Sequence, residues 1–288
     1  MTYVDPKNDL IFKKIFGQHP HLTISLLNAL LPLDEGREIV SLEYLDAELV
    51  PELIWMKNSI VDVRCVDREG RQFLVEMQML WTDAFKSRVL FNASKAYVKQ
   101  LETRRRYAEL QPVYALSLVN QNFEPNTEQF YHHYALYHHE LRDRKIDGIE
   151  LVFVELKKFK PQSVADRRMM VLWLRFLTEV AEETSEIDGE LLDHPDIREA
   201  LEYVKISGMT KEELEGYDQY WDGIRSEITL IDGAERKGRQ EGRQEGVQVA
   251  VQIIKMHIQG TSIKEIAART KLSLSEVETI LQNAGLIG

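Results

Sequence analysis

The chain has 288 residues, of which 44% are hydrophobic, and it carries a formal net charge of −11. This length is enough for a domain with its own core plus a second region, and no apolar run approaches the roughly 18 residues of a membrane span, which argues against a membrane protein. The single cysteine, Cys65, excludes an internal disulfide, and the N-terminus lacks a signal-peptide pattern, so a reducing cytoplasm is expected.

The negative charge is concentrated in one segment. Residues 179–234 contain 17 acidic and 4 basic residues, whereas residues 1–178 contain 24 of each. The N-terminal part is therefore neutral overall and has basic patches available to phosphates.

The first predicted elements are two helices, over residues 8–16 and 21–31, the first capped by Asp5 with Pro6 at its first position. A hairpin is predicted next, because two β-type runs flank Asp67-Arg68-Glu69-Gly70. Asp suits the start of a type I turn and Gly70 suits the left-handed position that follows. This turn pairs Asp67 with Arg71, and therefore Asp62 with Glu76.

Residues that are directly opposed on two strands share a face, with Cβ atoms roughly 5 Å apart. The carboxylates of Asp62 and Glu76 would then repel each other unless something compensates their charge. A hard divalent cation is a natural compensator, since Mg²⁺ takes one or two carboxylates together with water and phosphate oxygens. The hairpin alone still favours the alternative of a solvated face with scattered charges.

A long helix is predicted over residues 83–110. Four basic residues lie on one face of it at spacings of seven, four and seven: Arg88, Lys95, Lys99 and Arg106. This face is equally consistent with contacts to DNA phosphates and with an ordinary solvated surface.

Three strands are predicted next, over residues 112–119, 131–140 and 150–154. The second contains four histidines at positions without the spacing that suits a shared metal, so a polar strand surface is favoured over a zinc site. An apolar helix over residues 166–183 and an acidic, mostly helical segment follow. For that segment, a solvated bundle is favoured over a cover for the basic helix.

A repeat follows in which Gly, Arg, Gln and Glu each recur every four positions between Gly238 and Gly246. In a helix the glycines would form one stripe that permits close approach of another helix, but a flexible tether is equally plausible. The last segment is similar to a helix-turn-helix, with Ser273 and Glu276 forming a capping box. Its second helix has acidic residues and no Arg or Lys, which favours oligomerisation or protein binding over reading DNA bases.

The motifs together resemble one known family. They are DPKNDLIFKKIFG at the start, the pair IVDVRCVD and FLVEMQ, the helix with Arg88, Tyr97 and Gln100, the strand PVYALSLV, and VFVELKKF. In this order they are similar to the PD-(D/E)XK nuclease family transposases, or recombination-promoting nucleases, over about residues 1–160. The resemblance implies an α/β fold: a restriction-endonuclease-like mixed sheet flanked by helices, here followed by an all-helical C-terminal region.

The resemblance also implies a site for Mg²⁺, with Mn²⁺ as the other candidate. It makes Asp62 and Glu76 the metal ligands, adds the main-chain carbonyl of Met77, and places Gln78 where the broader superfamily has a lysine. Glutamine can position water by hydrogen bonding but has no charge. The resembled family also has Glu-x-Gln here, so the change does not imply inactivity. A lysine from elsewhere could take the place of the motif lysine, and Lys13, Lys95 and Lys99 are the candidates.

We therefore expect a nuclease-like domain at 1–162, an acidic helical region at 163–234, and a repeat with a helix-turn-helix-like tail at 235–288. The leading function is a metal-dependent DNA endonuclease of recombination or mobile-element processing. The alternative is a catalytically weak or inactive nuclease-fold protein that binds DNA or protein. Cutting both DNA strands favours a homodimer. No nucleotide-binding loop is visible, so no nucleotide cofactor is expected.

Overall fold

The computed structural model describes residues 2–46, 48–49, 59–60, 62–103, 106–161 and 168–287. The chain divides into two compact units, Met1–Trp221 and Asp222–Gly288. The predicted boundary between residues 162 and 163 lies outside the described residues. None of the helices in the described ranges is both long and apolar enough to cross a membrane.

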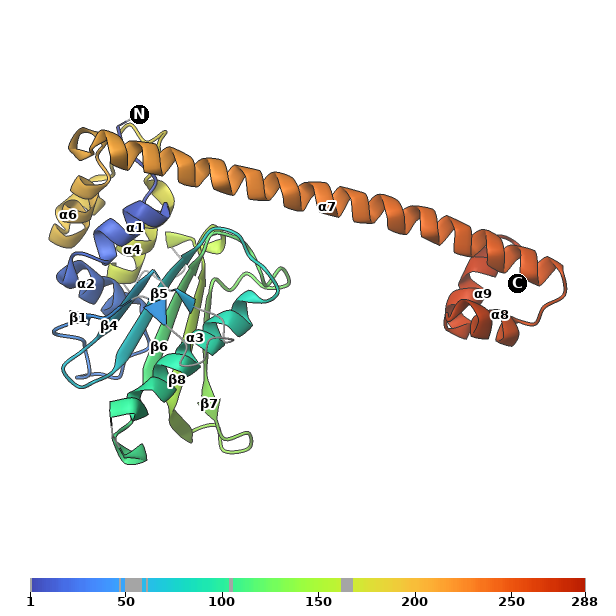
Figure 1. Ribbon diagram of the computed structural model, residues 1–288, viewed down its shortest axis with the longest axis horizontal. Coiled ribbons are helices and arrows are strands. Elements are labelled where there is room, and N and C mark those ends of the chain that lie inside the picture. The colour runs from blue at the N-terminus through green and yellow to red at the C-terminus, as the bar shows by residue number, and fades with distance from the viewer. Residues whose placement is uncertain are drawn as a thin grey trace. The chain divides into compact units, whose positions relative to one another are not determined.

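The first unit is built around a mixed six-stranded sheet (Figure 1). Its strands, in spatial order, are β1 (Glu43–Tyr44), β4 (Val63–Val66), β5 (Gln72–Gln78), β6 (Val113–Val119), β8 (Lys145–Glu155) and β7 (Tyr131–Tyr137). The central strands β5, β6 and β8 are parallel, and the outer pairs are antiparallel. A separate short pair joins β2 (Glu48–Leu49) and β3 (Ser59–Ile60). The predicted fold class is confirmed.

Helix α3 (Phe85–Lys99) packs on one face of this sheet, where Phe85 and Val89 meet Leu74 and Phe153 in an apolar core (Figure 1). The other helices of the unit pack against one another. They are α1 (Asp9–Phe16), α2 (Pro20–Leu30), α4 (Arg168–Glu179), α5 (Gly189–Asp193) and α6 (Pro195–Tyr203). The acidic segment thus contributes α5 and α6, which pack with α4 and the N-terminal helices.

Two predicted helix boundaries are wrong. The N-cap of α1 is Asn8 and not Asp5, because the Asn8 side chain accepts hydrogen bonds from the first main-chain amides of the helix. Helix α3 ends at Lys99 and does not continue to residue 110. The Gln100 side chain instead bonds the main-chain N–H and C=O of Gln111, at 2.9 Å each, so the chain turns back and Arg106 lies outside the helix.

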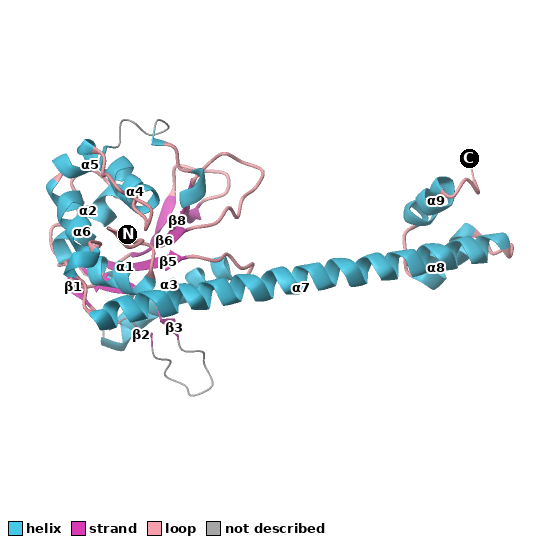
Figure 2. Ribbon diagram, turned by 90° about the horizontal axis from the view of Figure 1, so that it is seen from above, coloured by secondary structure: helices cyan, strands magenta, loops and turns pink. Residues whose placement is uncertain are grey.

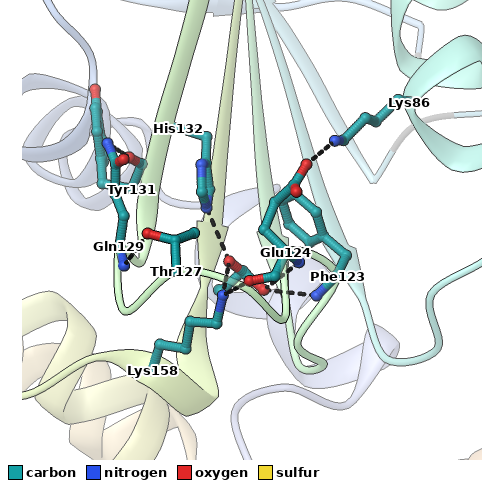
Figure 3. A network of polar contacts seen from close by, with 9 residues as sticks. Lys86, Phe123, Glu124, Thr127, Gln129, Tyr131, His132 and Lys158 are labelled. Carbon is teal, nitrogen blue, oxygen red and sulfur yellow. Dashed lines mark hydrogen bonds and ion pairs between the residues drawn. The ribbon is translucent and has the colours of Figure 1, made fainter.

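The sequence suggested a simple polar surface for the histidines on β7, but two of them contact buried carboxylates. His132 Nε2 lies 2.8 Å from a carboxylate oxygen of Glu155, and His133 Nε2 lies 2.7 Å from one of Glu150. Both glutamates are buried. Glu155 is the centre of a polar network that also includes Lys158 and the loop after β6 (Figure 3). These histidines therefore serve as hydrogen-bond partners of buried carboxylates.

Helix α7 (Lys211–Ile258) is continuous through the Gly-Arg-Gln-Glu repeat, so the repeat is a helix and not a flexible tether. The C-terminal end of α7 packs with α8 (Ile263–Thr270) and α9 (Leu274–Asn283) around a small core that includes Ile253, Ile266 and Leu281 (Figure 2). The predicted capping box of Ser273 and Glu276 is present.

Candidate metal centre

The β4–β5 hairpin sets the position of the two predicted metal ligands. Asp67 Oδ1 accepts hydrogen bonds from the main-chain amides of Glu69 and Arg71, and Gly70 has a φ of +86°. Arg71 Nε donates to Asp67 Oδ2 at 2.6 Å, and both side chains are buried. This turn gives the ladder in which Val63 pairs with Val75, as predicted. Asp62 and Glu76 occupy the next position along the two strands.

Asp62 is held by its neighbour strand. Its Oδ2 accepts a hydrogen bond of 2.6 Å from the main-chain amide of Met77, and its Oδ1 lies 3.6 Å from Lys13 Nζ. Burial raises the pKa of Asp62 to about 7, and the nearby charges of Asp9 and Glu76 also raise it, whereas Met77 and Lys13 act against the shift. The site therefore disfavours a second negative charge when no cation is bound.

Glu76 lies on the face of β5 that meets α3. Its Oε1 accepts a hydrogen bond of 3.0 Å from Asn92 Nδ2, and its Oε2 lies 3.4 Å from Arg88 Nη2. Burial raises the pKa of Glu76 above its ordinary value, although Arg88 and Asn92 both act to lower it. Glu76 is thus a buried carboxylate whose charge is only partly compensated.

Gln78 follows Glu76 and Met77 on β5. Its Oε1 accepts a hydrogen bond of 2.7 Å from Arg88, and its Nε2 donates to the carbonyl of Leu80. Arg88 therefore contacts both Glu76 and Gln78, and it ties α3 to the end of β5. The Gln78 side chain thus lies beside the carboxylate pair, and both its amide oxygen and its amide nitrogen are already hydrogen-bonded.

The predicted basic face of α3 is divided by the structure. Arg88 reaches the carboxylates, whereas Lys95 lies over the ring of Phe91, and burial and nearby Lys99 lower the pKa of Lys95. Arg106 pairs with Glu109 in the short turn beyond the helix. Only Arg88 of the four is thus shown in contact with the carboxylate pair.

Three further side chains at the site were not assigned to it from sequence. Lys13 had been named without preference over two other lysines, and Asp9 and Asn92 had not been named. Asn92 follows Arg88 by four residues, so the helical period was a usable signal. Asp9 and Lys13 also stand four apart, and their ion pair of 2.7 Å brings Lys13 between two carboxylates. Their approach to Asp62 depends on tertiary packing.

The donors present fit a hard divalent cation that keeps several waters. Asp62, which is half-buried, and Glu76, which is buried, supply two carboxylates with raised pKa, and close like charges favour a bound cation. Among the described residues, no group of three or more His, Cys, Asp or Glu side chains is arranged to hold a metal ion. The set therefore suits Mg²⁺ or Mn²⁺ with water and phosphate as remaining ligands, and does not suit a closed structural zinc site.

A family model described as PD-(D/E)XK nuclease family transposase matches residues 6–234. The chain belongs to this family. No curated protein and no solved structure matches the chain. The match includes the hairpin and α3, so the paired carboxylates lie within a domain of a family of nuclease type, and the family generally uses divalent metals and acts on DNA.

Proposed function

We propose that this protein is a divalent-metal-dependent DNA endonuclease that acts in recombination or in the processing of mobile elements. The observation that supports it best is the pair of incompletely compensated carboxylates, the half-buried Asp62 and the buried Glu76, at the end of a hairpin in a chain of this family. Protein cores rarely hold such a pair without a functional reason, because each buried charge costs free energy.

Asp62 and Glu76 are proposed to hold Mg²⁺ or Mn²⁺ together with the main-chain carbonyl of Met77. When bound, such an ion lowers the pKa of water and offsets charge on the phosphate. The amide of Met77 keeps Asp62 in place through a 2.6 Å hydrogen bond. Asn92 and Arg88 hold Glu76 in the same way from α3.

Lys13 is proposed to replace the motif lysine that Gln78 lacks. It lies on α1 and its ammonium group is 3.6 Å from Asp62 Oδ1. Burial acts to lower the pKa of Lys13, but Asp9 and Asp62 outweigh it and raise the pKa, so Lys13 stays charged at neutral pH. A fixed cation at this place can stabilise negative charge on a phosphodiester as it reacts.

The DNA backbone is proposed to lie along α3 and the turn after it. Lys95, Lys99 and Arg106 would neutralise phosphates there, and Gln78 would position water beside the carboxylates. Cleavage of both strands requires two sites, which favours a homodimer. Cys65 is buried and reduced in this proposal, in keeping with a cytoplasmic protein.

The test is cleavage of supercoiled plasmid by the purified chain in MgCl₂ or in MnCl₂, with EDTA and Asp62→Ala as controls. We expect nicked and linear DNA that depends on metal and is lost in the variant. Persistence of cleavage in a folded Asp62→Ala protein would sink the assignment of the site.

A second candidate is a nuclease-fold protein that binds DNA or protein without cutting. The arrangement of Arg88 favours it, because this cation already contacts Glu76 and occupies the Gln78 amide. It predicts that the chain binds DNA without cutting it. It also predicts that the heat measured on addition of Mn²⁺ is the same for the wild type and for Asp62→Ala. Isothermal titration with Mn²⁺ separates the two candidates even if the correct DNA substrate is missing.

A further inference from the structure

Helix α7 is largely exposed between Ile224 and Gly246, where only Ile224 and Gly233 are partly buried. At about 100° per residue, seven residues of this stretch fall within about 40° of a single line along the helix. They form what we call the α7 seam: Ile224, Ile228, Ile231, Glu235, Gly238, Gly242 and Gly246. Ile228 is 40% exposed and Ile231 45%. Large apolar side chains therefore line up on the solvent side of the helix.

No contact among the described residues accounts for the glycines of the seam. Glycine in a helix interior costs about 1 kcal/mol relative to alanine. A Cβ placed on Gly238, Gly242 or Gly246 meets no atom within 4 Å, so no contact in the described residues requires its absence. Close approach of a second helix does require it.

The two flanks of the seam carry opposite charge. One flank holds Arg225, Arg236, Arg239 and Arg243, with one acidic residue, Asp232. The other holds Glu227, Glu241 and Glu245, with one basic residue, Lys237. Glu235 lies within the seam itself, and its Oε1 is 3.1 Å from Arg239 of the same helix.

This distribution of charge identifies the partner and its direction. In a parallel pair of identical helices, each flank of one helix faces the opposite flank of the other, so arginines meet glutamates. In an antiparallel pair each flank faces its own copy, so like charges meet. The flanks are therefore complementary to a second copy of this chain in parallel orientation.

We propose that the α7 seam pairs with the α7 seam of a second copy to form a parallel two-stranded helical dimer. Helix α7 begins within the first unit, Met1–Trp221. Parallel pairing therefore brings the first units of the two copies to the same end of the helix pair. This inference deepens the homodimer of the proposed function, by giving it an interface, but association through α7 does not depend on catalysis.

The first experiment measures the mass of the full-length chain in solution by sedimentation equilibrium. We expect a dimer, and weaker association in Arg239→Glu/Arg243→Glu, where both flanks become acidic. Loss of several flanking pairs corresponds to roughly tenfold or more in the dissociation constant. Adding Glu241→Arg/Glu245→Arg exchanges the flanks and should restore the dimer. A chain that is monomeric at tens of micromolar overturns the proposal.

A second pair of variants tests the seam. Gly242→Leu should weaken the dimer by holding the helices apart, whereas Gly233→Leu, which lies on the opposite side of α7, should not. Gly242 is exposed and Gly233 is partly exposed, and a Cβ at either position meets no atom within 4 Å, so neither substitution should unfold the protein. Equal effects of the two variants would contradict pairing through the seam.

The direction of the helices is tested by disulfide trapping. In a parallel pair Ile231→Cys faces itself and should crosslink under mild oxidation, whereas Ser226→Cys, on the far side, should not. The native Cys65 is buried and does not interfere. A dimer that fails to crosslink at position 231 would show antiparallel or different packing. A dimer that neither cleaves plasmid nor shows Mn²⁺ binding that is lost in Asp62→Ala refutes only the proposed function, and a cleaving monomer refutes only this interface.

Discussion

Lys13 and Asp62 come from elements that are far apart in the sequence, yet Lys13 Nζ lies 3.6 Å from Asp62 Oδ1. The same ammonium group is 2.7 Å from Asp9 Oδ1, one helical turn before it on α1. This contact distinguishes Lys13 from the other two candidate lysines, because Lys95 and Lys99 lie on α3 and Lys95 is placed over Phe91. The site has a lysine beside its carboxylates even though β5 does not supply one.

Replacement of Lys13 by methionine should reduce the rate of plasmid cleavage by roughly 10²-fold, because a fixed positive charge beside the phosphate is lost. The loss should fall on kcat more than on KM. The matched control is Lys14→Met, since Lys14 Nζ pairs with Glu213 at 2.6 Å and does not reach the carboxylates. Wild-type turnover in a folded Lys13→Met protein would remove Lys13 from the mechanism.

Replacement of Asp62 by asparagine should abolish cleavage and stabilise the metal-free protein. The pKa of Asp62 is raised from 3.8 to about 7, so its charged form is disfavoured in the folded state. Its contribution to stability is present below about pH 4 and is lost as the pH rises through 7. In urea denaturation without metal, the free energy of unfolding of the variant at pH 8 should therefore exceed that of the wild type by about 1–3 kcal/mol. Near pH 4 the two proteins should differ little.

The control for this prediction is Asp67→Asn, which changes a buried carboxylate in the turn of the same hairpin. Asp67 is fully partnered by Arg71 and two main-chain amides, so its replacement should destabilise the protein at pH 8. If Asp62→Asn and Asp67→Asn lowered the free energy of unfolding equally, the charge of Asp62 would not be uncompensated in the folded protein.

A feature of the site could be predicted where residues close together in the sequence determine it. The register of the hairpin follows from the turn chemistry of Asp67 and Gly70, and it was read correctly from the sequence. The contact of Lys13 with Asp62 depends on how α1 packs, and the end of α3 depends on Gln100 bonding Gln111. Neither is encoded in a local pattern, because each joins segments that meet only in the folded chain.

Replacement of Arg71 by methionine should destabilise the protein by about 3–5 kcal/mol, because it leaves the buried carboxylate of Asp67 without its cation. Arg71 also donates to the carbonyl of Arg37 at 2.7 Å, so a second main-chain group loses its partner. Chemical denaturation measures the effect. Arg68→Met in the exposed part of the same loop is the control and should change the free energy of unfolding by less than about 0.5 kcal/mol.

Replacement of Glu155 by glutamine should destabilise the protein at neutral pH, by about 3–5 kcal/mol, because the ammonium group of Lys158 loses its carboxylate partner and keeps only the carbonyl of Glu124. Glu155 is fully buried and accepts hydrogen bonds from the main-chain amides of Phe123 and Glu124, at 2.6 and 3.2 Å (Figure 3). Glu155 therefore fastens the loop after β6 to the end of β8. The parallel register places this residue level with Val119, and Val119 level with Gln78.

The pH dependence of stability gives this prediction its control. Burial acts to raise the pKa of Glu155, but the hydrogen bonds from Lys158, His132 and the two amides outweigh it, so the pKa is lowered below 4.5. The stabilisation is therefore present above pH 4.5 and is lost as the pH falls through the folded pKa. In thermal melts, the difference between wild type and Glu155→Gln should shrink below pH 4. Glu128→Gln, an exposed residue of the same loop that pairs with Lys160, should show no such difference at any pH. If the difference in Tm between the wild type and Glu155→Gln stayed constant across this pH range, Glu155 would stabilise the protein through its shape and not through its charge.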